Sequence, residues 1–374
     1  MSKRFIPVAS PLLTGNEKAY VLDCIESSWI SSCGKYVEMF ERTFADFCGV
    51  RYAVSCNSGT AALHIALLAL GIGAGDEVIV PTLTFVATAN AVTYCGARPR
   101  FVDVEPDTWT LDPGLVEAKI TPRTKAILPV HLYGHVANMD AITEIARKHN
   151  LFVVEDAAEA HGAEFRGRRV GSLNDAAAFS FYGNKIVACG EGGMMVTDSE
   201  RLARCAAQLR GQGVDSKKRY WFPIIGYNYR MPNLAAAVGL AQLERIDCHL
   251  NRRREVASWY RDNLGDLPGI RWQVQKDGRG NVDWLFTITL NEPIRVTRDD
   301  VIDRLSKRGV ETRPVFHPMH TLPPYQEMGR EDGDFPVAEQ VASSGLSLPT
   351  WAGLQRDDVT YVCEALRECI AEAK

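Results

Sequence analysis

Short apolar runs alternate with helical patterns along the first half of the chain. Between about residues 50 and 200, runs such as "YAVSC", "DEVIVP" and "LFVVEDAA" have the length of buried strands. Segments such as "TAALHIALLALG" and "MDAITEIARKHN" lie between them and have the pattern of helices. This order predicts an α/β fold, with a mostly parallel sheet and helices on both of its faces.

The pattern changes beyond residue 231. The segment "PNLAAAVGLAQLERIDCHLNRRREVASWYRDNLG" predicts one or two long helices that lead into a smaller domain. The runs "IRWQVQ" and "VDWLFTITL", separated by "DGRGN", predict a hairpin, and a final helix is expected near residues 356 to 373. We therefore expect a large domain over residues 1–245 and a small C-terminal α+β domain over residues 246–374.

The composition favours an enzyme that acts on small molecules. The 374 residues include 42 basic and 46 acidic side chains, for a net charge of −4. This balance produces no strong field that would attract nucleic acid or an anionic membrane. The N-terminal "MSKRFIPVASPLLTG" lacks the apolar segment of a signal peptide, and no stretch approaches the length of a membrane span. Ten scattered cysteines without a CxxC pair indicate reduced thiols, so we expect a cytoplasmic location.

The segment "SCNSGTAALHIALLALG" predicts a site for a phosphate group. Asn57, Ser58, Gly59 and Thr60 form a tight turn after a strand, and an amphipathic helix then begins with unpaired amide groups. The N-terminus of such a helix binds phosphate. An ordinary helix cap by Ser58 or Thr60 explains the same residues equally well.

Carboxylates follow a second predicted strand. The segment "LFVVEDAAEAHG" brings Glu155, Asp156 and Glu159 to the end of an apolar strand. Acids at strand ends often only cap the chain or face solvent. A carboxylate here would also suit the protonated pyridine nitrogen of pyridoxal phosphate. Asp156 is the best candidate because it lies last on the strand.

A single lysine follows a third predicted strand. Lys185 comes after the apolar run "DAAAFSFYG", close to Ser180 and to the glycines of "GEGG". An apolar and aromatic setting disfavours the ammonium form, so the amine can act as a base and can form a Schiff base with an aldehyde. The alternative is an ordinary lysine on a surface loop, which the neighbouring aromatic residues disfavour.

Phe85 is the fourth candidate, in the segment "VIVPTLTFVATANAV". It lies shortly after a strand, where its ring would either stack on a flat cofactor or pack in the core. Histidines offer no comparable site. His131 and His135 lie in a strand and turn rather than on a helix, and the histidines of "HPMH" are equally unsuited, so no metal site is expected.

Taken together, these segments resemble a known family of enzymes. The chain is similar to the DegT/DnrJ/EryC1/StrS family of pyridoxal phosphate-dependent sugar aminotransferases over nearly its whole length. The segments that carry the resemblance are "WISSCG", "CNSGTAALHIAL", "VIVPTLTFVATANAV", "EDAAEAHGA", "SFYGNKIVACGEGGM" and "NYRMPNLAAAVGLAQL". The resemblance implies the type I aminotransferase fold, pyridoxal 5'-phosphate as cofactor, and a homodimer with its active site at the subunit interface.

The resemblance also implies roles for individual residues. Lys185 would bind the cofactor covalently, Asp156 would bind the pyridine nitrogen, and Phe85 would stack on the ring. The residues implied at the phosphate are Ser58, Gly59, Thr60 and Ser180.

Three more residues are expected at the edges of the site. Asn228, in "YNYRM", matches the asparagine that reaches the phosphate from the neighbouring subunit, and Glu159 matches a position near the ring hydroxyl. His317, in "RPVFHPMH", is the residue expected in the sugar pocket.

The implied reaction transfers an amino group from L-glutamate to a nucleotide-linked ketosugar. The segments "RGQGVDSKKRYWFPIIGYNYRMPN" and "RPVFHPMHTLPPY" most resemble members that act on GDP-4-keto-6-deoxy-D-mannose, for the O-antigen of lipopolysaccharide or related surface glycans. A UDP- or dTDP-linked ketosugar is the nearest alternative, because base contacts cannot be inferred from sequence. Lys185 argues against the related sugar dehydratases, which have histidine at this position. Lys185 and Asp156 together argue against a non-catalytic regulatory protein.

Overall fold

A seven-stranded sheet forms the centre of the computed structural model, which describes residues 4–276 and 278–371. Its strands, in order across the sheet, are β1 (Tyr52–Cys56), β9 (Gly193–Thr197), β8 (Ala176–Ser180), β5 (Phe152–Asp156), β4 (Thr124–Ile127), β2 (Glu77–Pro81) and β3 (Arg98–Val102). Strand β9 runs opposite to the other six strands, which all share one direction. The predicted mostly parallel sheet is therefore confirmed.

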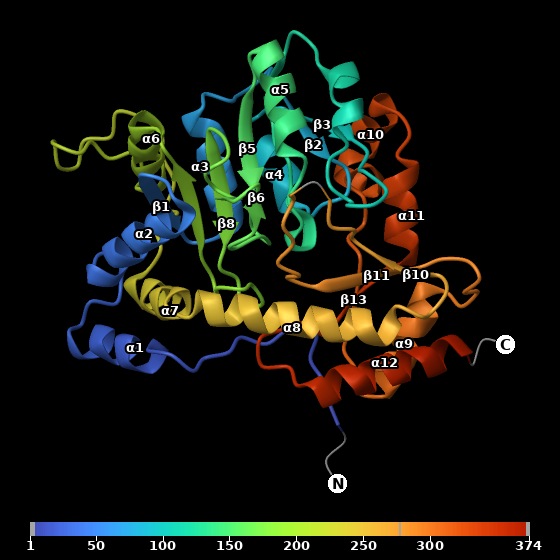
Figure 1. Cartoon of the computed structure of the whole chain (residues 1–374). Coiled ribbons are helices and arrows are strands. Elements are labelled where there is room, and N and C mark those ends of the chain that lie inside the picture. The colour runs from blue at the N-terminus through green and yellow to red at the C-terminus, as the bar shows by residue number, and fades with distance from the viewer. Residues whose placement is uncertain (1–3, 277, 372–374) are drawn as a thin grey trace.

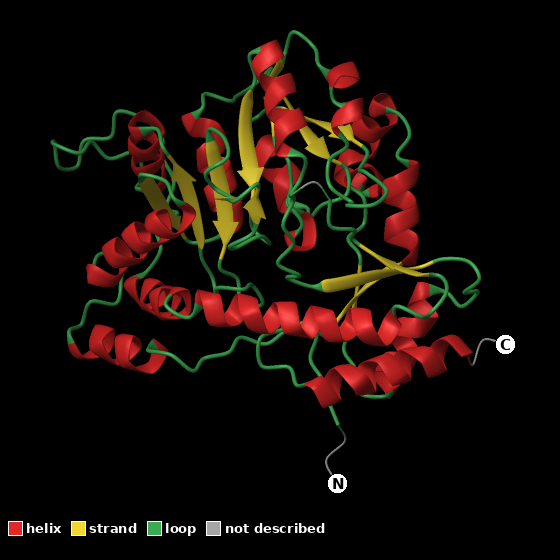
Figure 2. Ribbon diagram, viewed as in Figure 1, coloured by secondary structure: helices red, strands yellow, loops and turns green. Residues whose placement is uncertain are grey.

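Helices flank this sheet on both faces (Figure 2). They are α1 (Glu17–Glu26), α2 (Lys35–Cys48), α3 (Gly59–Ala69), α4 (Ala87–Tyr94), α5 (Met139–His149), α6 (Glu200–Arg210) and α7 (Asn233–Leu243). Helix α3 packs against β8 and β9 and contacts both α4 and α6, whereas α5 contacts β4 and β5. Because helices cover it on both sides, strands β2 and β9 are buried along their whole length.

Helix α5 shows how the local sequence produces these elements. Its buried residues Met139, Ile142 and Ala146 recur at spacings of three and four residues, which places them on one face of a helix. The side chain of Asn138 accepts a hydrogen bond from a backbone amide of the first turn, and Asn150 ends the helix in the left-handed conformation with φ of 54°. The amphipathic pattern and both end signals therefore agree.

The strands of a second, smaller sheet follow the long helix α8 (Ile246–Leu264) in the chain. Helix α8 runs beneath the large sheet and reaches the smaller one (Figure 1). This sheet is antiparallel, with the strand order β10 (Ile270–Trp272), β11 (Phe286–Leu290), β13 (Gly345–Leu348) and β12 (Arg313–Pro314). The remaining helices are α9 (Arg298–Lys307), α10 (Gln326–Asp332), α11 (Pro336–Ser344) and α12 (Arg356–Ala371), and a small ribbon pairs β6 (Glu164–Phe165) with β7 (Arg168–Arg169). The predicted pairing of the strands around residues 270 and 290 is confirmed.

Buried apolar side chains form two clusters. The larger cluster surrounds the seven-stranded sheet, and the smaller one joins α8, α9, α12 and the antiparallel sheet and includes Ile6. Helix α8 contributes Ile246 and Leu250 to the larger cluster but Val256 and later residues to the smaller one. Helix α8 belongs to both clusters, so the domain boundary after residue 245 stays a prediction. No helix in the described part of the chain is long and apolar enough to cross a membrane.

Candidate active site

The carboxyl ends of four strands meet at one edge of the large sheet. β1 and β8 are both antiparallel to β9, so they point the same way as each other, and β5 and β2 share that direction through their parallel pairing. Segments that follow these four strands line one cavity of about 490 Å³. Ligands of α/β proteins bind at this kind of edge.

Most of the predicted site residues meet in this cavity. The cavity-lining residues that the sequence predicted are Ser58, Gly59, Thr60, Phe85, Asp156, Glu159, Ser180 and Lys185. They come from separate stretches of the chain, so only the fold brings them together.

The amine of Lys185 lies in a largely buried position. Its Nζ is 3.5 Å from Oε1 of Glu159, and it lies over the indole ring of Trp284, 3.7 Å from the ring centroid. Burial lowers the pKa of Lys185, while the carboxylates of Glu159 and Asp156 act in the opposite direction. The site therefore favours a neutral amine more than water does.

The carboxylate of Asp156 is the last group of β5 and is buried. Its Oδ2 accepts a hydrogen bond from the hydroxyl of Thr88 at 2.7 Å, and its Oδ1 accepts one from the amide of Ala158 at 3.2 Å. The Thr88 hydroxyl is also 2.8 Å from that of Thr84. Burial raises the pKa of Asp156, and these hydrogen bonds together with the charge of Lys185 oppose that rise.

Glu159 links Lys185 to a neighbouring loop. Its Oε2 accepts a hydrogen bond from the backbone amide of Tyr133 at 2.8 Å, while Oε1 faces Lys185. Burial raises the pKa of this carboxyl, and the nearby charge of Lys185 is the largest opposing influence. The two side chains therefore stabilise each other's charged forms.

The N-terminus of α3 approaches the end of β8 at the cavity. The hydroxyl of Ser58 accepts a hydrogen bond from the amide of Ala61, so Ser58 is the helix cap that the sequence allowed as an alternative. A Cβ atom at Gly59 would lie only 2.7 Å from Cβ of Ser180, so glycine permits this close approach. The amides at the start of a helix have no partner within it, and at Gly59 and Thr60 they are available to an anion.

Phe85 lies at the edge of the cavity with 54% of its surface exposed. Its ring centroid is 5.5 Å from that of Phe316. Phe316 is in turn stacked on Tyr133, with the ring planes at 23°. The cavity therefore has an aromatic wall with an open ring at its end.

Three of the lining residues that the sequence analysis missed come from the C-terminal part of the chain. Trp284, Arg313 and Phe316 reach the cavity from the part of the chain beyond α8. Trp284 lies in "VDWLFTITL", which predicted only a strand, whereas Arg313 and Phe316 lie in the segment that was singled out for His317. The signal for Arg313 and Phe316 was therefore present, but Trp284 had none.

Asn228 and His317 are not among the cavity-lining residues. The backbone oxygen of Asn228 accepts a hydrogen bond from the side chain of Asn57 at 3.5 Å, and its side-chain oxygen accepts one from Arg230 at 3.2 Å. The side chain of His317 is exposed. Their expected roles at the phosphate and in the sugar pocket stay predictions.

The arrangement has a definite chemical capacity. A buried amine can react with an aldehyde, a buried carboxylate can bind a protonated ring nitrogen, and a helix N-terminus can bind a phosphate. These groups line one cavity, together with aromatic rings that suit a flat ligand.

The chain was compared with known families, sequences and structures, and the family match includes every residue that lines the cavity. A sequence model of the DegT/DnrJ/EryC1/StrS aminotransferase family matches residues 11–367. The chain is 54% identical over 367 residues to GDP-perosamine synthase from Caulobacter vibrioides and 45% identical over 365 residues to that from Escherichia coli O157:H7, with 98% of each chain covered in both cases. Among solved structures, S. venezuelae DesV in complex with a ketimine intermediate is similar with a TM-score of 0.89, at 42% identity and with 94% of each chain covered.

Proposed function

Because the chain belongs to the DegT/DnrJ/EryC1/StrS aminotransferase family, we propose that it transfers an amino group from L-glutamate to C4 of GDP-4-keto-6-deoxy-D-mannose, which gives GDP-perosamine. The two GDP-perosamine synthases of high identity support this acceptor. The observation that carries the proposal is the buried amine of Lys185, which faces Glu159 in the cavity that Asp156 also lines. The product would serve the O-antigen of lipopolysaccharide or related glycans. The scattered cysteines, which include no CxxC pair, suit a cytoplasmic enzyme.

The cavity fits pyridoxal 5'-phosphate as the cofactor. Asp156 suits the protonated ring nitrogen, Lys185 suits the aldehyde, and Phe85 suits a face of the ring. The amides of Gly59 and Thr60, with the hydroxyl of Ser180, suit the phosphate. When bound, this cofactor supplies the electron sink that makes proton removal from a substrate carbon possible.

Lys185 moves the proton in both half-reactions. Because burial lowers its pKa, Nζ is available to remove the proton from Cα of L-glutamate. In the second half-reaction it delivers a proton to C4 of the sugar, the carbon that receives the amino group. Glu159, 3.5 Å from Nζ, stabilises the ammonium form after each proton uptake. Asp156 would hold a proton on the ring nitrogen of the bound cofactor.

Arg313 is positioned to bind the carboxylate of the amino donor. The cationic residues among the described lining of the cavity are Lys185 and Arg313, whereas Asp156, Glu159 and Glu191 are acidic. A guanidinium stays charged and binds a carboxylate through paired hydrogen bonds. Arg313 would thus direct the amino acid into the cavity toward Lys185.

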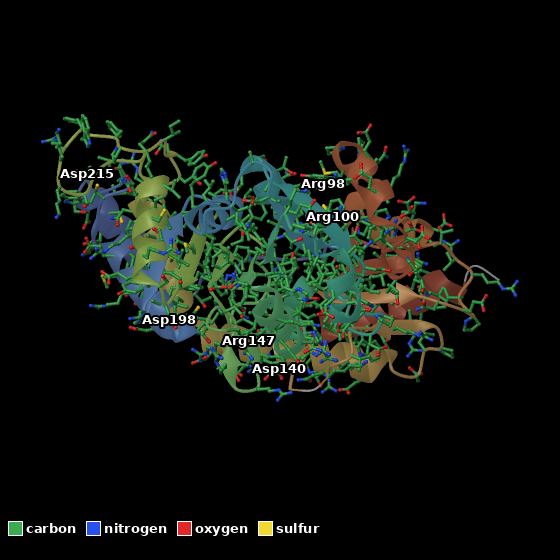
Figure 3. All side chains as sticks on the ribbon, turned by 90° about the horizontal axis from the view of Figure 1, so that it is seen from above. Arg98, Arg100, Asp140, Arg147, Asp198 and Asp215 are labelled. Carbon is green, nitrogen blue, oxygen red and sulfur yellow. The ribbon has the colours of Figure 1, made fainter. Side chains whose placement is uncertain are left out.

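A homodimer with shared active sites is part of the proposal. The loop between α6 and α7 projects from the body of the molecule (Figure 1), and Asp215 marks its far end in Figure 3. The loop exposes Tyr220, Trp221, Phe222 and Ile225, with 89% of Ile225 accessible. Exposed apolar side chains in such number are typical of a surface that a partner covers. We infer that this loop meets a second copy of the chain and carries Asn228 to the partner's phosphate.

An assay of the acceptor tests this function. Purified protein with pyridoxal phosphate and L-glutamate is incubated separately with GDP-, UDP- and dTDP-linked 4-ketosugars, and products are identified by mass and proton coupling. We expect amination of the GDP-linked sugar. Preference for a UDP- or dTDP-linked sugar would contradict the proposed acceptor, and absence of any aminated product would contradict the enzyme activity. Lys185→Ala is the matched control without the reacting amine.

A further inference from the structure

The indole ring of Trp284 covers the amine of Lys185. Nζ lies 3.7 Å from the ring centroid, on the face of the ring, and 3.5 Å from the carboxylate of Glu159. The electron-rich face of an indole attracts an ammonium group, and the attraction grows where water is excluded. Trp284 is only 3% exposed, so this contact lies in a dry part of the cavity.

Several contacts hold Trp284 in this orientation. Its indole Nε1 donates a hydrogen bond to the backbone oxygen of Asn184 at 2.9 Å. Its backbone amide donates to the oxygen of Tyr133 at 3.0 Å, and its backbone oxygen accepts from Nη1 of Arg253 at 2.7 Å. The rings of Trp284 and Tyr133 are parallel to within 16°. The indole face is therefore fixed beside Lys185.

The contact joins two parts of the fold at the reacting amine. Trp284 stands two residues before β11 of the antiparallel sheet, whereas Lys185 follows β8 of the large sheet. The hydrogen bond from Trp284 to Asn184 reaches the residue next to Lys185. The position of the indole relative to Nζ is thus set by the loop that carries the lysine.

We propose that Trp284 is a positioning residue for Lys185, and that its ring face holds the ammonium form of the released amine in place between proton uptake and proton delivery. This inference rests on the proposed function, in which Lys185 alternates between a bonded and a free state. The free amine has to take up and deliver protons from one place. The indole face and Glu159 define that place from two sides.

Other groups around Lys185 act on the same protonation. The titratable and charged side chains that face it are Asp156 at the end of β5, Glu159 just beyond β5, Arg313 on β12, Glu191 and Tyr182 in the cavity wall, and His161. The two carboxylates raise the pKa of Lys185 and Arg313 lowers it. Burial lowers the pKa of His161 to about 3, so this ring is neutral near pH 7. Trp284 carries no charge, and its ring can be altered without a change in the charges of the site.

The test measures the pKa of the Lys185 amine in the cofactor-free full-length chain. Competitive labelling with acetic anhydride over a range of pH, read by mass spectrometry of the peptide that contains Lys185, gives this value. Tryptophan at position 284 alone is replaced by mono-, di- and trifluorinated tryptophan, which keep nearly the same shape and weaken the attraction for a cation. We expect the pKa of Lys185 to fall stepwise with fluorination, by about 0.5 to 1 unit in total.

Matched variants separate this role from packing. Trp109 is also 3% exposed but does not line the cavity, so the same fluorinated residues placed there should leave the labelling curve unchanged. Trp284→Phe keeps an aromatic face and should give a smaller fall than Trp284→Leu. An unchanged pKa across the fluorinated series, in protein with the wild-type circular dichroism, would show that Trp284 only packs and would overturn the inference. Labelling needs neither substrate nor cofactor, so that failure is distinct from a failed ketosugar assay.

Discussion

At the scale of single residues, the charge state of Asp156 depends on a short chain of hydroxyl groups. Thr84 lies within hydrogen-bonding distance of Thr88, and Thr88 donates to the carboxylate of Asp156. Burial alone would favour a protonated, neutral carboxyl, which binds a protonated ring nitrogen poorly. In the proposed function Thr88 therefore supports cofactor binding through Asp156.

Thr88→Val removes this hydroxyl at nearly constant volume. We expect cofactor affinity to fall about 10- to 100-fold, because a hydrogen bond to a charged group contributes about 1.5–3 kcal/mol. Thr88→Ser keeps the hydroxyl and should bind nearly as well as wild type. Spectrophotometric titration of cofactor-free protein with pyridoxal phosphate measures both. Equal affinities for the valine variant and wild type would show that Thr88 does not support Asp156.

At the scale of elements, the start of α3 is shaped by its contact with β8. Gly59 is the first residue of α3, and Ser180 is the last residue of β8. The close approach at Gly59 aligns the helix N-terminus with the cavity while Ser58 caps it. In the proposed function, this packing directs the amides at the start of α3 toward the phosphate of the cofactor.

Gly59→Ala should force α3 away from β8. We expect a loss of about 1–3 kcal/mol in the free energy of unfolding, which is typical of overpacking, together with weaker binding of pyridoxal phosphate. Gly73→Ala is the matched control, because a Cβ atom there meets nothing within 4 Å and should change stability by less than about 0.5 kcal/mol. Urea unfolding and cofactor titration measure the two effects. Wild-type values for Gly59→Ala would mean that the helix end adjusts freely.

At the scale of the whole molecule, the proposed dimer divides each active site between two chains. One chain supplies Lys185 and the turn at residues 57–60, and the projecting loop of the other supplies Asn228. In a two-fold symmetric dimer, each chain then contributes its lysine to one site and its Asn228 to the other.

Mixed dimers test this division. Homodimers of Lys185→Ala lack the amine in both sites, and homodimers of Asn228→Trp should have both phosphate sites blocked, so both should be nearly inactive. Subunit exchange between the two variants places both lesions in one site and leaves the other site intact. We expect part of the wild-type activity to return in a simple turnover assay. If mixed dimers form and fold but remain inactive, Asn228 does not serve the partner's site.

Acid stability is a second property of the whole molecule. His161 is surrounded by the rings of Phe44, Phe179 and Phe181, and burial lowers its pKa from 6.5 to about 3. Below about pH 6.5 the unfolded chain gains a proton that folded His161 does not, so this residue lowers the free energy of unfolding by up to about 1.4 kcal/mol per pH unit.

His161→Phe should therefore flatten the acid side of the stability profile. We expect its free energy of unfolding to fall less steeply than that of wild type between about pH 6 and pH 4, by up to the slope of one proton, with a constant difference above about pH 7. Urea unfolding at a series of pH values measures both slopes. Parallel curves for the two proteins would show that His161 titrates normally in the folded chain.

The sequence by itself determined the order of the elements and the residues that end them. Asp156, Ser180 and the turn at residues 57–60 directly follow apolar runs, and Lys185 lies in the turn after Ser180. In a mostly parallel sheet such positions gather at one edge, because the strands share a direction. Local pattern was therefore sufficient to predict the large sheet and several of the residues that line the cavity.

Only the tertiary structure decided which residues complete the cavity from the other side. Trp284 and Arg313 lie in or beside strands of a separate antiparallel sheet, and nothing in their local sequence indicates Lys185 as a neighbour. The Thr88 hydroxyl likewise reaches Asp156 from the first turn of α4, where nothing in the local sequence indicates that contact. Contacts between distant elements depend on how α8 joins the two sheets and on how side chains pack there, and no periodicity along the chain records that geometry.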